Sequence, residues 1–289
     1  MAPDRDADHL IHRAIVERVE ELSLIEPAVR ADDDDAVHQM RVTIRRIRSL
    51  LRAEAGAPEA TADIDADLRW LAGVLGAARD AEVLAQRYRH ALQELDPQLV
   101  RGRVVERLVD DAESGYRSGW SASVTALDSP RYRQLLTRLD ALAAAPTHRG
   151  KHRQESEPDT VRGAYRRVRK AAKKSVSVDG AGHDEALHRI RKAAKRLRYT
   201  AAAMGAPSVA EQAKALQTLL GDHQDSVVSR AHLRAQSRAA YDAGEDTFTF
   251  GLLYQREVEI ARHCRAHLDA ALAELSDAVS ALAGGRAGL

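Results

Sequence analysis

Two short stretches of the chain place His, Arg and Lys side chains at helical spacing. In the first stretch His38, Arg41, Arg45, Arg48 and Arg52 follow one another at intervals of three or four residues. Because an α-helix has 3.6 residues per turn, these intervals place all five side chains on one stripe of a helix. No Asp or Glu interrupts the stretch, so the acidic partners that usually lie one helical turn away are missing. The stripe therefore predicts a site for a ligand that carries several negative charges.

The same pattern returns 150 residues later in the chain. There His188, Arg191, Lys195 and Arg198 repeat the intervals, and both stretches fit H-x-x-R-x-x-x-[RK]-R-[IL]-R. Guanidinium offers a planar pair of donors to two phosphate oxygens, Lys supplies a compact charge, and a protonated imidazole donates two N–H groups. The alternative is a solvated basic face whose Arg stems cover the edge of the core. Such a face tolerates scrambling, whereas the two copies keep the same phase, so we interpret them as a duplicated phosphate-binding surface.

Each cationic stripe lies beside an apolar stripe of the same period, displaced by one residue. An amphipathic helix buries its apolar stripe, so the cations are expected next to the buried seam and not on the far face of the helix. This placement favours a recessed basic groove over a flat charged surface. The apolar residues are Val37, Met40, Ile44, Ile47 and Leu51 in the first stretch and Leu187, Ile190, Ala194 and Leu197 in the second.

A second motif, L-x-x-[VL]-L-G-x-x-[RQ]-D-x-x-V, follows each of the two stretches. Its glycine, Gly76 or Gly221, predicts close helix packing or a kink. Its aspartate, Asp80 or Asp225, is a candidate to orient the arginines of the first motif, and solvation or capping is the alternative. Immediately before the aspartate the first copy has Arg79 and the second has Gln. The two halves are therefore not equivalent at this position.

The elements that must position these side chains are expected to be helices. Ala, Leu, Arg, Asp and Glu dominate the composition, while the 289 residues contain only two Phe and two Trp. Runs that favour strands are scarce, so the sequence predicts an all-α fold. Two helical halves, 7–145 and 160–283, are joined by a polar linker at 146–159, with Asp35 as the N-cap of the first motif helix. The expected helices are 7–29, 36–55, 60–95, 98–122, 129–145, 160–176, 184–204, 208–242 and 246–283.

The charge and the cysteine content limit the classes of protein to which this chain can belong. The net charge is only +1, which argues against a generally basic protein, but residues 160–200 hold 13 basic and three acidic residues. That local field should attract polyanions. The single cysteine, Cys264, excludes an internal disulfide and a cysteine-rich metal site, and is expected to be a small core residue. The polar, acidic N-terminus and the lack of long apolar runs predict a soluble, cytoplasmic protein without membrane contact.

The two motifs and their duplication resemble the CHAD family, whose name refers to conserved histidines in an α-helical domain. The resemblance rests on residues 38–48 and 75–80 and extends over about 7–283, so 1–289 is interpreted as a single CHAD domain. It implies two helical bundles related by pseudo-two-fold symmetry, with a basic central groove or cavity that binds inorganic polyphosphate. Many CHAD domains are fused to a CYTH triphosphatase domain, recognised by alternating glutamates on an early strand. No such strand is found, so a stand-alone CHAD protein is expected, with association with polyphosphate granules as a further expectation.

The family's basic positions carry over onto both halves of this chain. Arg162, Arg166, Arg169 and Lys173 form a further stripe that could line the same groove, and it exists in the second half only. The groove is therefore expected to be asymmetric. The expected polyphosphate-binding residues are His38, Arg41, Arg45, Arg46, Arg48, Arg52, Arg79, Arg162, Arg166, Arg169, Lys173, His188, Arg191, Lys192, Lys195, Arg196, Arg198 and Tyr199.

Three other functions compete with polyphosphate binding. A metal-dependent phosphohydrolase would need carboxylates around a metal, and the chain has no P-loop and no H-E-x-x-H or G-x-S-x-G motif, so no catalysis, cofactor or metal is expected. Nucleic-acid binding is the stronger rival because any phosphate polymer suits an arginine row, although Tyr199 is the sole aromatic residue on a motif helix. A scaffold without an anionic ligand would leave a basic interior uncompensated.

Overall fold

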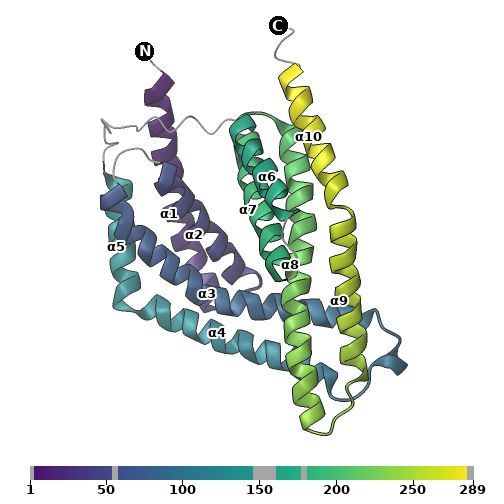
Figure 1. Cartoon of the computed structure of the whole chain (residues 1–289). Coiled ribbons are helices and arrows are strands. Elements are labelled where there is room, and N and C mark those ends of the chain that lie inside the picture. Colours follow the sequence, from purple (N-terminus) through teal and green to yellow (C-terminus); the bar gives the residue numbers. More distant parts are fainter. Residues whose placement is uncertain (1–2, 54–57, 146–160, 177–180, 285–289) are drawn as a thin grey trace. The chain divides into compact units, whose positions relative to one another are not determined.

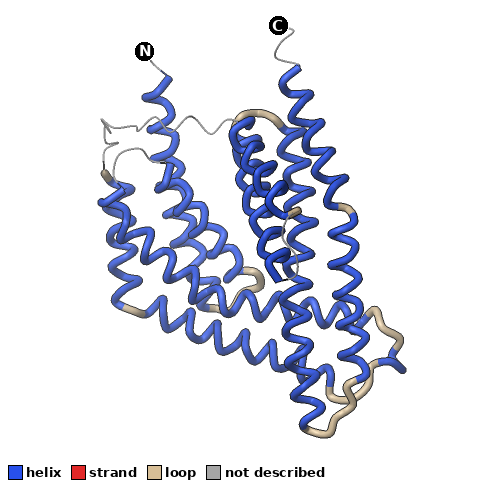
Figure 2. The backbone as a smooth tube through the Cα atoms, in the orientation of Figure 1, coloured by secondary structure: helices blue, strands red, loops and turns tan. Residues whose placement is uncertain are grey.

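The computed structural model describes residues 3–53, 58–145, 161–176 and 181–284. In these ranges all regular structure is helical, as Figure 2 shows, which confirms the all-α prediction. None of the described helices is long and apolar enough to cross a membrane. The elements are α1 (Pro3–Arg30), α2 (Ala36–Ala53), α3 (Pro58–Gln93), η1 (Pro97–Leu99), η2 (Glu106–Asp110), α4 (Asp111–Asp128), α5 (Pro130–Ala144), α6 (Val161–Ser175), α7 (Ala181–Ala203), α8 (Pro207–Asp242), α9 (Phe248–Ala266) and α10 (Leu268–Gly284), labelled in Figure 1.

The chain divides into two compact units. Unit 1 consists of Met1–Leu95 and Val105–Gln154, and unit 2 consists of Asp96–Val104 and Glu155–Leu289. Unit 1 therefore contains α1 to α5 with η2, and unit 2 contains α6 to α10 with η1. Each unit holds one cationic motif helix, α2 or α7, packed beside the long helix that carries the second motif, α3 or α8.

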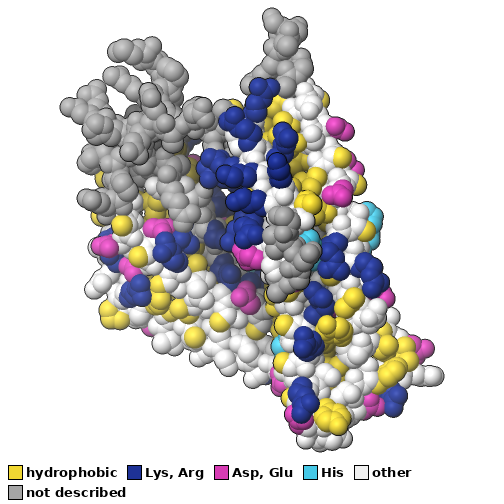
Figure 3. Space-filling view, viewed as in Figure 1, with side chains coloured by type: hydrophobic (Ala, Val, Ile, Leu, Met, Phe, Trp, Pro, Cys, Tyr) yellow, Lys and Arg dark blue, Asp and Glu magenta, His cyan; other side chains and the backbone are white. Residues whose placement is uncertain are grey.

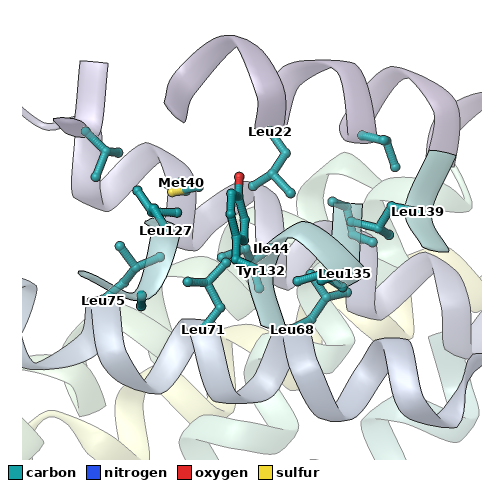
Figure 4. Close-up of a cluster of buried hydrophobic side chains, with 14 of the residues drawn as sticks. Leu22, Met40, Ile44, Leu68, Leu71, Leu75, Leu127, Tyr132, Leu135 and Leu139 are labelled. Carbon is teal, nitrogen blue, oxygen red and sulfur yellow. The ribbon is translucent and has the colours of Figure 1, made fainter. Parts of the chain in front are cut away.

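The core of unit 1 forms around the apolar stripe of α2. Met40, Ile44 and Ile47 are fully buried, and they pack against leucines of α3 and against α1 and α5. Figure 4 shows Met40, Ile44 and Leu71 around Tyr132, whose hydroxyl donates a hydrogen bond of 2.8 Å to Glu26. Burying large apolar side chains is the main source of stability in such a bundle. The predicted apolar stripe of the first motif helix is therefore confirmed.

A glycine sets how closely α3 and α4 approach each other. An added Cβ at Gly119 would lie 2.6 Å from the backbone nitrogen of Ala78. Real side chains do not tolerate that distance, so no other residue fits this crossing without moving one of the helices. Ala78 precedes Arg79 in the second motif, and the crossing thereby fixes the part of α3 that presents Arg79.

The core of unit 2 repeats the arrangement around α7. Leu187, Ile190, Ala194 and Leu197 are each at most 1% exposed, as the apolar stripe predicted. They form one cluster with residues of α6, α8 and α10, including Val168. Small residues are frequent in this cluster, so α6 and α7 lie close together.

The segment Asp96–Val104 belongs to unit 2 although both its neighbours in the chain belong to unit 1. The Thr249 hydroxyl donates to the Leu99 carbonyl at 2.7 Å and accepts from the Arg101 N–H at 2.8 Å. Gly102 has a φ of +68°, and an added Cβ would lie 2.7 Å from the carbonyl oxygen of Asp246. These contacts hold the segment against the start of α9. No sequence pattern indicated that Asp96–Val104, called the exchanged segment below, would belong to unit 2.

Two predicted helices are wrong in extent, while the others match within a few residues. The predicted helix 98–122 starts only after the exchanged segment, as the π-helical turn η2, and continues as α4 to Asp128. The predicted helix 246–283 is interrupted at His267, which separates α9 from α10. The His267 ring contacts the carbonyl oxygen of His263 at 2.8 Å, and the His267 backbone N–H also donates to this oxygen at 3.1 Å. The predicted linker 146–159 lies outside the described residues.

Candidate functional site

In unit 1 the cationic stripe of α2 meets α3 at Arg41. Its Nη1 atom is fully enclosed, has no hydrogen-bond acceptor, and lies 3.6 Å from Oδ1 of Asp80. Burial lowers the pKa of the Arg41 guanidinium; Asp80 opposes this effect, and Arg45 and Arg79 add to it. Positive charges are therefore crowded here. Asp80 accompanies Arg41, as the sequence suggested.

The motif glycines leave room for an arginine side chain, Arg41 in unit 1 and Arg191 in unit 2. An added Cβ at Gly76 would lie 2.9 Å from Nη1 of Arg41, and one at Gly221 would lie 3.5 Å from Nε of Arg191. The same contact, motif arginine on motif glycine, thus occurs within each unit. The nearest atoms at both glycines belong to guanidinium groups, so the missing side chain leaves room for an arginine; close helix packing or a kink stays a prediction.

Arg79 is held by two carboxylates in unit 1. Its Nη1 lies 2.8 Å from Oε2 of Glu82 and 3.8 Å from Oδ1 of Asp35. Asp35 adopts a φ of +59° and accepts a hydrogen bond from the Gln39 side chain, so it lies at the start of α2 with its carboxylate beside the cations. Burial lowers the pKa of His38; Arg79 lowers it further, and Asp35 raises it.

The other residues of α2 that were predicted to bind ligand have different partners from Arg41. Arg48 forms a forked ion pair with Asp65 of α3, at 2.7 and 3.4 Å, and Arg46 lies 3.7 Å from Glu21 of α1. Arg45 is exposed and forms no ion pair with any described residue. Arg52 lies in α2, but its side chain is outside the described part. The structure therefore brings His38, Arg41, Arg45 and Arg79 together, and it ties Arg46 and Arg48 to separate carboxylates.

In unit 2 the cations of α7 have different surroundings. His188 Nδ1 and Arg191 Nε are both enclosed without a hydrogen-bond partner, and Arg191 forms no ion pair with any described residue. The expectation that Asp225 orients the motif arginines of this half stays a prediction. Arg198 donates to the neutral Gln217 at 3.4 Å and lies 5.5 Å from the ring of Tyr199, which is exposed. Lys192 and Arg196 are also exposed, and Lys195 is half-buried.

Helix α6 adds a second row of cations to unit 2. Seven of its fifteen residues are Lys or Arg, and none is acidic. Four of them, with Tyr165 and Leu272, surround an open pocket of about 460 Å³. Figure 3 shows Lys and Arg side chains gathered over this helix. The basic residues of the pocket are Arg166, Arg169, Lys170 and Lys173; these four and the exposed Arg162 form no ion pair within the described ranges.

One buried histidine in unit 2 was not singled out by the motifs. His223 lies in α8 two residues after Gly221, is 1% exposed, and has an enclosed Nε2 without a hydrogen-bond partner. Its Nε2 lies 3.6 Å from Oδ1 of Asp184 in the first turn of α7. Burial lowers the pKa of His223; Asp184 opposes this, while nearby cations add to it. Its position offered one signal in the sequence: His223 follows the apolar Leu220 of the second motif by three residues, the spacing of one buried helix face.

Other reactive groups do not gather in the described ranges. No group of three or more His, Cys, Asp or Glu side chains there is arranged to hold a metal ion. Cys264 is buried in α9, as expected of a core residue. The chemistry that the described side chains offer is therefore the donation of charged N–H groups to an anion.

Sequence comparison decides the family. The profile of the CHAD domain matches residues 13–234. The chain belongs to the CHAD family. Two Mycobacterium tuberculosis proteins, uncharacterized protein MT2285 of strain CDC 1551 / Oshkosh and uncharacterized protein Rv2226 of strain ATCC 25618 / H37Rv, are each 58% identical to it over 276 residues. Each match covers 93% of this chain and 53% of the relative, so the chain spans about half the length of these curated relatives.

Solved structures show the same fold. The crystal structure of the CHAD domain from the plant Ricinus communis matches with a TM-score of 0.67 and 27% sequence identity, over 93% of this chain and 91% of that chain. PptA from Streptomyces chartreusis matches with a TM-score of 0.61 and 14% identity, over 91% of this chain and 98% of that chain. The likeness to PptA concerns the fold alone.

Proposed function

We propose that this CHAD domain binds inorganic polyphosphate through the cations of α2 and α3 in unit 1 and of α6 and α7 in unit 2, without turning it over. One observation carries the proposal. Arg41 and Arg191 each rest on a motif glycine with an enclosed N–H that has no protein acceptor. A buried donor without an acceptor is costly, more so when it is charged. Phosphate oxygens would supply the missing acceptors, and Arg is well suited to them.

The arrangement favours a phosphate polymer over a single phosphate ion. Each unit offers a row of cations, and a chain held by one cation presents its next phosphate to the neighbouring cation at high effective concentration. Both rows belong to one polypeptide, so a long chain can be bound by both units. The pseudo-two-fold arrangement and the common groove stay predictions, as do the cytoplasmic location and association with polyphosphate granules.

Calorimetric titration at low salt tests the proposal directly. Long-chain polyphosphate is expected to bind far more tightly than orthophosphate, and the affinity should fall steeply with salt because bound counterions are released, as for DNA. Duplex DNA and RNA compete in the same buffer as the rival ligands. Tighter binding of either nucleic acid, or no binding of polyphosphate, would reject the proposal.

A second assay separates binding from catalysis. The protein is incubated with polyphosphate, with and without Mg²⁺, and released orthophosphate is measured over time. We expect no release above the protein-free control. Steady release by the wild type that disappears when Arg41 and Arg191 are both changed to Met would establish a hydrolase and contradict the proposed role.

A further inference from the structure

The cations of unit 1 are partly occupied by the protein's own carboxylates. Arg79 contacts Glu82 and Asp35, and Arg41 contacts Asp80. We propose that Asp35, Asp80 and Glu82, the competing carboxylates, occupy the unit 1 cations in place of ligand, so that unit 1 engages only a phosphate chain that unit 2 already holds. This inference rests on the proposed function and assigns to these three residues the selection of long chains.

Glu82 is the strongest of the three competitors. Its ion pair with Arg79 is 2.8 Å long, and the side chains of the two residues are only 19% and 21% exposed. Ion pairs in such half-buried positions are less screened than fully exposed ones. Asp35 is farther from Arg79, at 3.8 Å, and Asp80 is mostly exposed at 3.6 Å from Arg41. The order of competition is therefore Glu82, then Asp35, then Asp80.

Unit 2 lacks the strongest part of this device, although Asp225 occupies the position equivalent to Asp80. Where unit 1 has Arg79 and Glu82, the second motif copy has Gln224 and Val227. Arg191, the counterpart of Arg41, forms no ion pair with a described residue, and neither does Glu185, the counterpart of Asp35. The pair formed by Arg79 and its competitor Glu82 is thus present in unit 1 and has no counterpart in unit 2.

The difference has a consequence for ligand length. A carboxylate on the same polypeptide acts at high effective concentration, so a short phosphate in solution displaces it poorly. A long chain bound to unit 2 is itself held at high effective concentration and can displace it. Short phosphates should therefore occupy unit 2 only, whereas long chains should engage both units.

Calorimetry with tripolyphosphate and long-chain polyphosphate tests this on the full chain. Wild type is expected to bind one tripolyphosphate, and Glu82→Gln a second one in the same concentration range. The variant should also bind long-chain polyphosphate roughly two- to fivefold more tightly, the range for an ion pair of this kind. Asp35→Asn should act in the same direction but less, and Asn tolerates the positive φ at this position.

Glu113→Gln is the matched control, because it removes one carboxylate of unit 1 that pairs with Arg89, away from the row. It should leave both the stoichiometry and the affinity unchanged. The inference is overturned if Glu82→Gln and Asp35→Asn both behave like this control, or if wild type already binds two tripolyphosphates. Absence of binding to either phosphate by every variant would instead reject the proposed function itself. Equal melting temperatures of the variants would show that the comparison is between folded proteins.

Discussion

The two units build the same motif helix and surround it differently. In unit 1, acidic side chains from α1, α3 and the turn before α2 pair with Arg46, Arg48 and Arg79. In unit 2, Arg191 and the pocket cations of α6 have no acidic partner among the described residues. The H-x-x-R repeat therefore determines where cations stand along a helix. The neighbouring helices decide whether those cations are available to a ligand.

Like charges along α6 and α7 also bear on stability. Neighbouring cations on one helix face repel each other, by a few tenths of a kcal/mol for each pair. The cost is offset by burial of the opposite face, where Val161, Ala164 and Val168 are at most 6% exposed. A bound polyanion removes the repulsion, so unit 2 should gain more stability from ligand than unit 1.

The largest expected effect is a loss of polyphosphate affinity that is greater for a change at Arg191 than for the same change at Arg41. Arg191→Met keeps the apolar stem of the side chain but removes the charge, and should weaken polyphosphate binding about 10- to 100-fold, as expected for a charge-assisted contact worth about 1.5–3 kcal/mol. Arg41→Met should cost less, roughly three- to tenfold, because Asp80 already competes for this arginine. Calorimetry measures both constants. Equal losses would remove the distinction between the units.

The next effect concerns the row on α6. Changing Arg166, Arg169 and Lys173 together to Gln should weaken binding and reduce the slope of log K against log salt by about two units, about 0.7 for each cation lost if the ligand behaves as a single strand. The same triple change should raise the melting temperature of the free protein, because it relieves repulsion. A control with Arg117, Arg133 and Arg262 changed to Gln removes three exposed cations outside the row. If this control changed the slope equally, α6 would act through net charge alone.

A smaller effect distinguishes the two motif glycines. Gly76→Ala places a methyl group 2.9 Å from the Arg41 guanidinium and must displace it, whereas Gly221→Ala meets Arg191 at an ordinary 3.5 Å. We expect Gly76→Ala to weaken binding several-fold and Gly221→Ala less than twofold. Both changes favour helix formation by up to about 1 kcal/mol, so neither should lower the melting temperature. Calorimetric titration of both variants with polyphosphate measures the difference. A larger loss of affinity in Gly221→Ala would refute the proposed contact of each arginine with its motif glycine.

Much of the fold could be predicted from the sequence, because helical period and burial are local properties. The apolar stripes of α2 and α7 and the bounds of most helices follow from residue spacing. The exchanged segment could not be predicted, since it depends on the contact between Gly102 and Asp246, which are far apart in the chain. Within the site, spacing predicted the cations, but the pairing of Arg48 with Asp65 depends on how α2 packs against α3. The break at His267 could not be predicted either, because apolar periodicity continues through it.

The smallest expected effect is on the pH dependence of binding, and it concerns His38 of unit 1. Burial and then Arg79 lower the pKa of His38, with Arg45 adding to this and Asp35 and Glu82 opposing it. His38 is therefore mostly neutral at pH 7 in the free protein. A bound polyanion offsets the repulsion from Arg79 and Arg45 and so raises this pKa. Protons must then be taken up on binding at pH values between the lowered free pKa and the raised bound pKa.

The sign follows from this linkage. Affinity should increase as the pH falls through the bound pKa of His38 and level off below its free pKa, which lies under the ordinary value of about 6.5. Calorimetry in buffers of different ionisation enthalpy measures the proton uptake at pH 8, 7, 6 and 5.5. His38→Gln should lose most of the uptake while retaining arginine-driven binding, and His90→Gln, which changes an exposed histidine paired with Glu94, should behave like wild type. Unchanged uptake in His38→Gln would place this histidine outside the ligand's reach. Uptake lost instead in His188→Gln would assign the proton to unit 2, which lacks the Arg79–Glu82 pair.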